Sequence, residues 1–153
     1  MHDAFDLKIA QRLQRAADEP LARIAAEVGL SPSATHRRIA RMRKSGAIRG
    51  QVCVLDPKAF GVGMTFIVGI TLEKVRVAEV SALKSRLKAA PEVQQAYNVT
   101  GEVDLLLVVL ARSVEDFERI SRRLFSADPK IRRYTTSVVM DRVKVGLTVP
   151  LGP

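Results

Sequence analysis

Basic side chains gather in one stretch of this chain in a pattern that suits a polyanionic partner. Between His36 and Arg49 there are six Lys or Arg residues and no Asp or Glu. A helix face that is merely solvated normally mixes both signs of charge. Cationic side chains neutralise phosphates, and an arginine can also donate two hydrogen bonds to the edge of a guanine. The stretch therefore predicts binding to double-stranded DNA.

Two short helices must position these residues. An apolar stripe with helical spacing begins at Leu21 and ends at Val28, and Gly29 can then take the positive φ that ends a helix. Ser31 is a good N-cap and Pro32 suits the first helical position, so a second helix is expected to begin there. Two helices around a glycine-containing turn predict a helix-turn-helix unit.

The second helix has an inner and an outer face. Thr35, Ile39 and Met42 form its inward stripe, so a helical wheel turns Ser33, Arg37, Ala40 and Lys44 outward. Bases are read near the N-terminus of such a helix. The expected base readers are Ser33, Ala34, His36, Arg37 and Arg41, and the expected phosphate anchors are Arg43, Lys44 and Arg49.

The three consecutive residues at positions 36–38 are expected to play different parts. Arg37 is the best candidate for a bidentate contact with guanine. Arg38 lies toward the packed side, where bracing the helices is the alternative to a DNA contact. For His36 a base contact, a phosphate contact and a place on the flank all stay open.

Composition agrees with a protein that binds an anion. The chain has 153 residues, is 47% hydrophobic and carries a formal charge of +9, which fits a folded protein with a nucleic-acid partner. No apolar run reaches the roughly 18 residues that span a bilayer, and the first residues lack a basic signal region. Cys53 is the single cysteine. We therefore expect a cytoplasmic location, a buried thiol at Cys53 and no membrane association.

The chain is expected to divide into two domains. Three helices fill about the first 45 residues, and Ala47 to Leu55 is predicted as a short strand that forms a hinge or wing. Asp56-Pro57 breaks this strand, which predicts a DNA-binding domain over residues 1–55, a linker over 56–63 and a second domain over 64–153.

The second domain is predicted as β-α-β-β-α-β. Its expected elements are strands at 64–72, 93–99, 103–111 and 131–140, with one helix at 77–89 and another that begins at Ser113 and is stopped by Asp128-Pro129. The strand at 103–111 is nearly continuous in apolar residues, as if buried on both faces. This order is that of a ferredoxin-like domain, so the fold class is α+β. Its sheet has a bare face that includes Ile67, which predicts homodimerisation.

One turn of this domain has side chains that suit a small ligand. Gly101, Glu102 and Asp104 lie between two predicted strands. Taken alone, they indicate a hairpin turn with acids at its tip. A zwitterionic amino acid, however, needs an acceptor for its ammonium group and backbone N–H groups for its carboxylate, and such a turn offers both.

Five blocks of the sequence resemble the leucine-responsive and asparagine-responsive regulator family (Lrp/AsnC). They are Asp3-Ala-Phe-Asp6-Leu-Lys-Ile9, Val28-Gly-Leu-Ser-Pro32 with Arg37-Arg38-Ile39, Gly46-Ala-Ile48-Arg-Gly50 with Asp56-Pro57, Thr100-Gly101-Glu102-Val-Asp104, and Tyr134-Thr-Thr-Ser137-Val-Val-Met140. The resemblance implies a winged or hinged helix-turn-helix domain, a ferredoxin-like sensing domain, dimers that assemble into octamers, and transcription adjusted by a bound amino acid. It also implies an effector pocket between dimers that includes Gly101, Glu102 and Asp104, with Thr135, Thr136 and Ser137 as further lining residues.

Two other classes of protein compete with this interpretation. An enzyme of similar plan would use histidine in its C-terminal domain, but His2 and His36 are the only histidines, and no metal-ligand cluster, nucleophile motif or phosphate-binding glycine loop occurs. No cofactor is therefore expected. An architectural protein that wraps DNA stays open, because Arg119, Arg122, Arg123, Arg132 and Arg133 add basic charge outside the helix-turn-helix.

Overall fold

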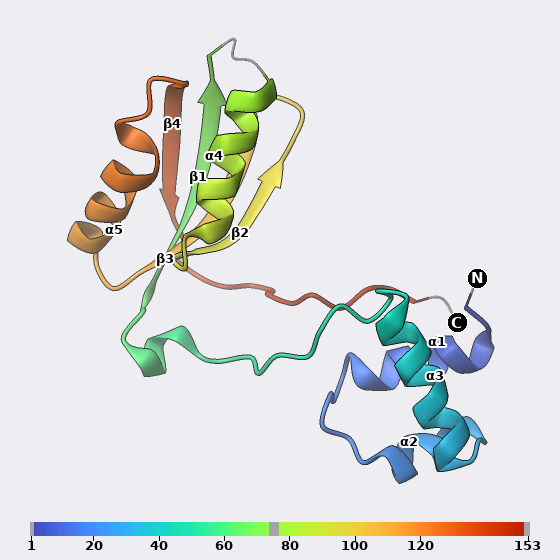
Figure 1. Ribbon diagram of the computed structural model, residues 1–153. Coiled ribbons are helices and arrows are strands. Elements are labelled where there is room, and N and C mark those ends of the chain that lie inside the picture. Colours follow the sequence, from blue (N-terminus) through green and yellow to red (C-terminus); the bar gives the residue numbers. More distant parts are fainter. Residues whose placement is uncertain (1, 74–76, 152–153) are drawn as a thin grey trace. The chain divides into compact units, whose positions relative to one another are not determined.

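The chain folds into two compact units, which Figure 1 draws as a ribbon. The structure is a computed structural model and describes residues 2–73 and 77–151. One unit comprises Met1–Val54 together with Lys144–Pro153, and the other is Leu55–Val143. The sequence assigned the last ten residues to the second domain. In the structure they belong with the first unit, because the chain after residue 143 returns to contact the first helix.

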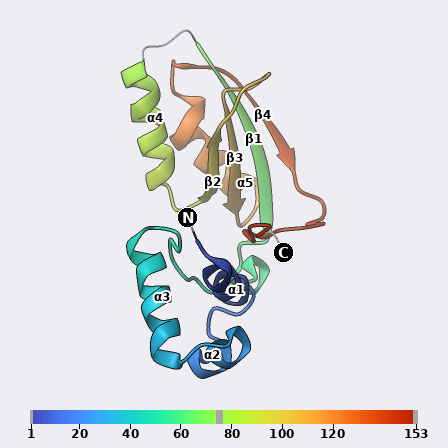
Figure 2. The ribbon, with the colours of Figure 1, turned by 90° about the vertical axis from the view of Figure 1, so that its right-hand side faces the viewer.

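The first unit is built from three helices, α1 (Ala4–Leu13), α2 (Leu21–Val28) and α3 (Pro32–Lys44). Figure 2 shows these three helices grouped together. One buried side chain of α1 lies in a small core with two from each of the other helices: Ile9, Ile24, Val28, Ile39 and Met42. The expected inward stripe of α3 is confirmed, since Thr35, Ile39 and Met42 are all buried.

The turn between α2 and α3 has the chemistry that the sequence predicts. Gly29 ends α2 with φ +73°, a left-handed conformation that a side chain would strain. The Ser31 hydroxyl then accepts the backbone N–H of Ala34 at 3.2 Å and caps α3, with Pro32 at the first helical position. These local signals fix where α3 begins.

The expected strand from Ala47 to Leu55 is wrong for the single chain. Residues 49–56 have no regular secondary structure, and a short 3-10 helix (η1, Pro57–Phe60) follows. The apolar side chains of Val52, Val54 and Leu55 are exposed, and so is Cys53, which was expected to be buried. A strand needs a neighbour to receive its backbone hydrogen bonds, and sequence alone does not reveal whether one chain supplies it.

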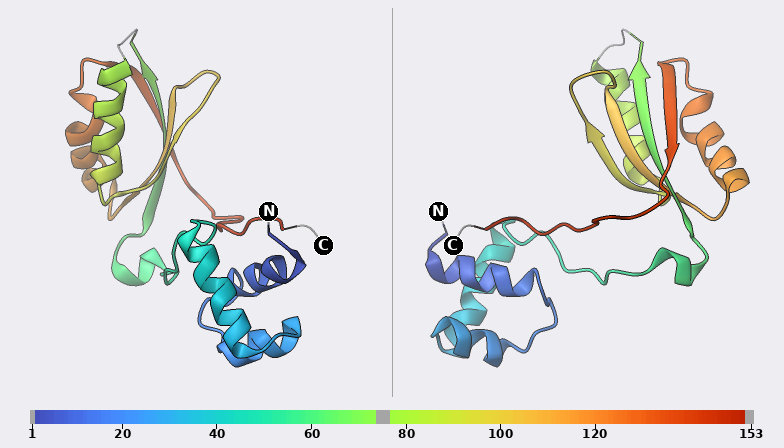
Figure 3. Two further views of the ribbon diagram at one scale, coloured as in Figure 1. Left: turned by 45° about the vertical axis from the view of Figure 1, so that its right-hand side comes forward. Right: turned by 180° about the vertical axis from the view of Figure 1, so that it is seen from behind.

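The second unit is a four-stranded antiparallel sheet with helices on one face. The strands are β1 (Met64–Leu72), β2 (Val93–Asn98), β3 (Leu105–Ala111) and β4 (Ile131–Val138), in the spatial order β2-β3-β1-β4. The helices are α4 (Val77–Ala89) and α5 (Val114–Ser121), the latter continued by a π-helical turn, η2 (Arg122–Ser126). Figure 3 shows both helices on the same side of the sheet. The predicted ferredoxin-like fold is confirmed.

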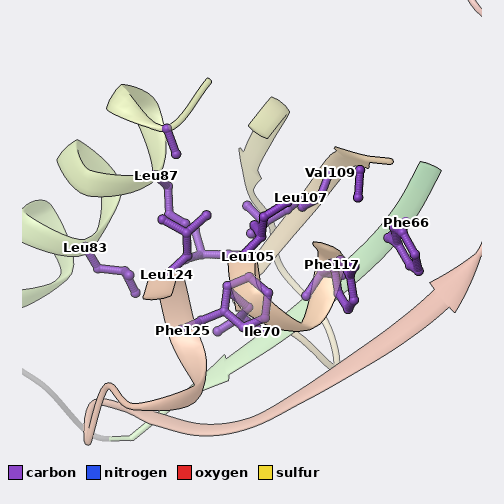
Figure 4. Close-up of a cluster of buried hydrophobic side chains, with 14 residues drawn as sticks. Phe66, Ile70, Leu83, Leu87, Leu105, Leu107, Val109, Phe117, Leu124 and Phe125 are labelled. Carbon is purple, nitrogen blue, oxygen red and sulfur yellow. The ribbon is translucent and has the colours of Figure 1, made fainter. Parts of the chain in front are cut away.

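A single hydrophobic core joins the helices to one face of this sheet. Figure 4 shows it: Phe66 and Ile70 from β1 and Leu105, Leu107 and Val109 from β3 meet Leu83 and Leu87 of α4 and Phe117, Leu124 and Phe125. The rings of Phe66 and Phe117 stack with centroids 4.0 Å apart. Val114 is exposed, because it is the first residue of α5 and lies outside this cluster.

The other face of the sheet has no helix. Residues of β3 alternate between buried and half-buried, so the expectation that this strand is buried on both faces is wrong. The half-buried set lies on the open face: Ile67 of β1 pairs with Val108 of β3, and Gly69 pairs with Leu106. Within the described residues, no helix combines enough length and apolarity to cross a membrane.

Candidate nucleic-acid interface and effector turn

The recognition helix α3 presents a basic outer face that carries no acid. His36, Arg37, Arg43 and Lys44 are exposed, as are Ser33 near the start of the helix and Arg49 beyond its end, whereas Ala34 is half-buried. The Ser33 hydroxyl lies 3.1 Å from that of Ser31, so it sits beside the N-cap. The predicted outward direction of Arg37 and Lys44 is thus confirmed, and their charges point away from the small core.

Arg38 braces the helices. One of its guanidinium nitrogens, Nη1, donates to Asp3 Oδ2 at 2.7 Å and to Asp6 Oδ1 at 2.8 Å, so the side chain ties α3 to the start of α1. Its guanidinium also lies 5.3 Å from the ring centroid of Phe5. Asp3 in turn caps α1 by accepting the backbone N–H of Asp6 at 2.9 Å. The bracing alternative for Arg38 is therefore confirmed.

Arg41 belongs to the same network, although it was expected to be a base reader. Its Nη2 donates to Asp6 Oδ2 at 2.8 Å, and Asp6 has only 2% of its side chain exposed. Burial raises the pKa of Asp6, but hydrogen bonds from Arg38 and Arg41 outweigh it and the net pKa lies below the ordinary value. Arg41 itself is 61% exposed, so it neutralises Asp6 with part of its guanidinium and presents the rest to solvent.

The signal for this network was present in the sequence as two matched pairs. Asp3 and Asp6 are three residues apart near the start of one helix, and Arg38 and Arg41 are three residues apart on another. Residues at this spacing share a helix face, so each pair forms one charged stripe. Only the packing of α1 against α3 decides that the two stripes meet.

A second set of contacts holds the C-terminal end of α3. Arg43 Nη2 donates to Gln51 Oε1 at 2.7 Å, and Gln51 Nε2 donates to the carbonyl of Ala17 at 3.0 Å. Since the Gln51 side chain is neutral, it orients Arg43 without removing its charge. The arrangement supports a cation at the end of the recognition helix that remains available to a phosphate.

The turn at residues 101–104 is a connection between strands, held by its own backbone. Gly101 has φ +121°, which only glycine adopts easily. The Asp104 carboxylate accepts the backbone N–H of Leu72 at 2.7 Å, at the point where the β1–β4 register shifts. Glu102 is exposed, and its carbonyl accepts the Thr71 hydroxyl at 3.4 Å. Asp104 therefore has a structural task as well as an exposed acidic group.

Gly69 allows this turn to lie against the sheet. A Cβ atom at Gly69 would meet Val103 Cγ1 and Thr135 Oγ1, each at 3.0 Å. Val103 thus packs over the bare backbone of β1 on the open face, and Thr135 lies beside it on β4. The structure brings the turn and Thr135 together across Gly69.

The three hydroxyl residues predicted on β4 do not share one face. Thr135 pairs with Gly69 and Ser137 with Ile67, which places both on the open face. Thr136 pairs with Val68, a residue of the helix-side core, so alternation along the strand directs Thr136 to the opposite face. Of the three, only Thr135 and Ser137 can contact a ligand on the open face.

Two shallow hollows on the surface lie away from the predicted effector residues. One of about 410 Å³ is lined by Arg12, Pro20 and their neighbours around the α1–α2 junction. The other, of about 300 Å³, lies near η2 and is lined by residues that include Arg86 and Lys130. Within the described part of the chain, no group of three His, Cys, Asp or Glu side chains is placed to hold a metal ion.

Most of the basic residues suggested as a wrapping path have local partners. Arg119, Arg122 and Arg123 form ion pairs with Asp116, Glu118 and Glu92, respectively. Arg132 and Arg133 are exposed on β4. Because three of the five arginines are compensated by neighbouring acids, the second unit offers a weaker phosphate track than the charge count suggests.

Family models match both parts of this chain. Residues 3–43 match the AsnC-type helix-turn-helix domain, and residues 65–149 match the Lrp/AsnC ligand binding domain. An uncharacterised HTH-type transcriptional regulator of Sinorhizobium fredii is 40% identical over 149 residues, which cover 97% of this chain and 86% of that protein. A glutamate uptake regulatory protein of Zymomonas mobilis is 30% identical, with 97% and 90% covered.

Solved structures with the same architecture are also similar over nearly the full chain. An AsnC family transcriptional regulator from Agrobacterium tumefaciens is 29% identical with a TM-score of 0.91, covering 98% of this chain and 97% of that one. A transcriptional regulator from Neisseria meningitidis, in complex with L-methionine, has a TM-score of 0.91 at 24% identity, with 99% and 97% covered. This second likeness shows the fold alone.

Proposed function

The chain belongs to the Lrp/AsnC family of transcription regulators, and on this premise we propose that it binds a specific duplex through the outer face of α3 and adjusts that binding when an amino acid binds its second unit. It is a DNA-binding regulator rather than an enzyme.

One observation carries the DNA-binding part of the proposal. Arg38 and Arg41 are the cations of α3 whose charge is compensated by Asp3 and Asp6, whereas no acid lies on the helix to compensate Arg37 and Lys44. Arg37 is near the start of α3, where bases are read, and Lys44 is its last residue. We assign Arg37 to a base contact, and Arg43, Lys44 and Arg49 to phosphates. The exposed part of the Arg41 guanidinium is assigned a secondary contact with DNA.

We propose the open face of the sheet near Gly69 as the effector site. Glu102, Asp104, Thr135 and Ser137 offer carboxylate and hydroxyl groups, and the glycine turn offers backbone N–H groups, which together suit an ammonium and a carboxylate. A carboxylate has several acceptor positions, so Asp104 can hold the Leu72 N–H and a ligand ammonium at once. The match of residues 65–149 to the Lrp/AsnC ligand binding domain supports a ligand in this unit, and one relative is named as a regulator of glutamate uptake, which is consistent with an amino acid as the ligand class.

We further propose that the protein is a homodimer that assembles into an octamer in the cytoplasm. The open face has half-buried Ile67, Leu106 and Val108, and the segment with Val52, Val54 and Leu55 exposes more apolar surface. Exposed apolar side chains of this kind favour burial against another copy. The effector residues lie on the same open face, so a ligand there would be enclosed by a second chain rather than by this one.

A thermal-melting screen of the full-length protein against the common amino acids, at millimolar concentration, tests the proposed ligand class. A ligand at 100 times its dissociation constant stabilises the folded protein by about 2.7 kcal/mol, which is readily measured. We expect a shift with one class of side chain. If no amino acid shifts the melting temperature, the effector proposal fails, while the DNA-binding part is judged separately by competition with unrelated duplex.

A further inference from the structure

The chain that follows β4 is fastened at two places. We call residues 139–151 the C-terminal strap. At its start, in the second unit, the backbone N–H of Val139 donates to the carbonyl of Thr65 at 2.9 Å, and Arg142 Nη2 donates to Thr65 Oγ1 at 2.5 Å. Its last residues lie in the first unit, on α1. Figures 1 and 3 show the red end of the chain beside the blue N-terminal helices.

The far end of the strap is held by a reciprocal pair of hydrogen bonds. Gln14 Nε2 donates to the carbonyl of Val149 at 3.1 Å, and the backbone N–H of Val149 donates to Gln14 Oε1 at 3.0 Å. The side-chain amide thus pairs with a peptide group as a neighbouring strand would. Gln11 Nε2 adds a bond to the carbonyl of Leu151 at 3.3 Å.

Between these two anchors the strap exposes its apolar side chains. Val143, Val145 and Leu147 are all exposed, although each is of a type that normally packs into a core. Segments with few buried contacts open at low cost in free energy. The strap is therefore held by specific contacts at its two ends, whereas its middle buries little apolar surface.

The helix that holds the strap also holds the recognition helix. Gln14 is the C-cap of α1, whereas Asp3 and Asp6 at the other end of α1 bind Arg38 and Arg41 of α3. A displacement of α1 would therefore reach the recognition helix through the buried carboxylate of Asp6. At the other anchor, Val139 is two residues beyond Ser137, one of the residues we assign to the effector site.

We propose that the C-terminal strap positions α1 and, through it, the recognition helix, and that Gln14 is the positioning residue that ties the strap down. The part of this inference that links the strap to the effector rests on the proposed function. The part in which the strap positions α1 does not. While the strap is bound to Gln14, it holds α1 and α3 in one arrangement. Less conformational entropy is then lost when DNA binds. Coupling is reciprocal, so DNA binding must also favour the engaged strap.

The test compares the full-length protein with the double variant Gln11→Ala/Gln14→Ala. Alanine has a higher helix propensity than glutamine, so α1 is not weakened by the change. Gln94→Ala, at an exposed glutamine of β2, serves as the matched control. Hydrogen exchange is followed in a peptide that includes the Val139 amide, with and without a short duplex of mixed sequence at low salt, and DNA affinity is measured over a range of salt concentrations.

For the unaltered protein and for Gln94→Ala, we expect DNA to slow exchange at Val139 by about fivefold. In the double variant this protection should be lost and DNA affinity should fall several-fold, with an unchanged salt slope and an unchanged melting temperature. The inference is overturned if DNA does not protect Val139 in the unaltered protein, or if the double variant protects it equally. A reduced salt slope would also overturn it, because the glutamines would then support a phosphate contact.

Addition of the amino acid found in the melting screen separates the two proposals. If an amino acid changes DNA affinity in the unaltered protein, the double variant should lose that change while it still binds the amino acid. If the amino acid still changes the DNA affinity of the double variant, the strap does not transmit the effect of the amino acid. If no amino acid acts, the effector proposal fails, and the exchange measurement alone decides the positioning role of the strap.

Discussion

The carboxylate of Asp104 accepts the backbone N–H of Leu72 at 2.7 Å, so an acidic residue of the proposed effector turn also secures the end of the first sheet strand. This double use affects how a variant at the position must be interpreted. Loss of the ligand response after removal of the side chain can follow from a missing ligand contact or from a loosened strand end.

Asp104→Asn should separate these two effects. Asparagine keeps an oxygen that can accept the Leu72 N–H but has no negative charge for an ammonium group. We expect the variant to melt close to the unaltered protein and to lose its response to the amino acid. Asp104→Ala should lose the response and also about 1 kcal/mol of stability, because the Leu72 N–H is left without this acceptor. A normal ligand response in Asp104→Asn would remove the Asp104 charge from the site.

Arg37→Ala and Lys44→Ala should have different effects on DNA binding. Arg37 is assigned to a base, so its loss should cost about 1–3 kcal/mol on the preferred duplex and little on others. Lys44 is assigned to a phosphate, so its loss should weaken all duplexes alike and reduce the salt slope by about one. Titrations with preferred and unrelated duplexes, over several salt concentrations, measure both effects. Equal losses on both duplexes from the two variants would contradict the assignment.

Asp6→Asn should destabilise the first unit more than Arg41→Ala does. Asp6 is buried between Arg38 and Arg41, so its removal leaves two guanidinium groups without this partner, at a cost of about 1–3 kcal/mol. Arg41→Ala leaves Asp6 paired with Arg38, and the lost pair is largely exposed on its arginine side, so about 1 kcal/mol or less is expected. Chemical denaturation of both variants gives the comparison, and the reverse order would show that Arg41 is the main partner of Asp6.

Stability should fall as the solution becomes acidic, and the Asp6 cluster should contribute to the fall. Hydrogen bonds from Arg38 and Arg41 hold the pKa of Asp6 below its ordinary value of 3.8, and His2 Nδ1 lies 3.5 Å from the same carboxylate. A carboxyl group with a depressed pKa stabilises the folded state above the ordinary value, and this contribution is lost as the pH falls through the lowered pKa. Melting curves between about pH 5 and pH 2 should show a smaller slope in Asp6→Asn than in the unaltered protein. An identical slope would exclude Asp6 as a contributor.

Gly69→Ala should disturb the effector site without touching the DNA interface. The new Cβ would lie 3.0 Å from both Val103 Cγ1 and Thr135 Oγ1, so both neighbours must move, at a cost of about 1–3 kcal/mol. We expect weaker amino acid binding and unchanged affinity for mixed-sequence duplex. Gly63→Ala is the control, because nothing lies within 4 Å of its Cβ position. Equal melting temperatures for the two variants would show that the space at Gly69 is not needed.

The sequence predicted the elements whose signals are local. Gly29, Ser31 and Pro32 define the turn and the start of α3 through backbone conformation and capping, which depend on neighbouring residues alone. The bounds of β1 and the start of the helix at Ser113 were likewise predicted, because hydrophobic period and helix capping are short-range properties.

Features that depend on distant partners were not predicted. Arg41 appeared as a base reader because nothing in its own helix reveals that Asp6, on another helix, lies within hydrogen-bond distance. Ala47 to Leu55 has the composition of a strand but finds no ladder within the described chain. Thr136 was grouped with Thr135 and Ser137 by adjacency in sequence, whereas the sheet register separates it from them.

The two outer strands of the sheet govern how copies of this protein can meet. Strand β2 carries Gln94, Gln95 and Asn98, and β4 carries Arg132 and Arg133. Each of these strands pairs on one side only, and an unpaired strand invites addition of another chain and growth into fibres. The arginines on β4 oppose addition of the β4 strand of another copy, because the like charges on the two strands repel each other. The apolar surface lies instead on the flat of the sheet, so the edge arginines direct the association that we propose toward the open face and away from strand addition.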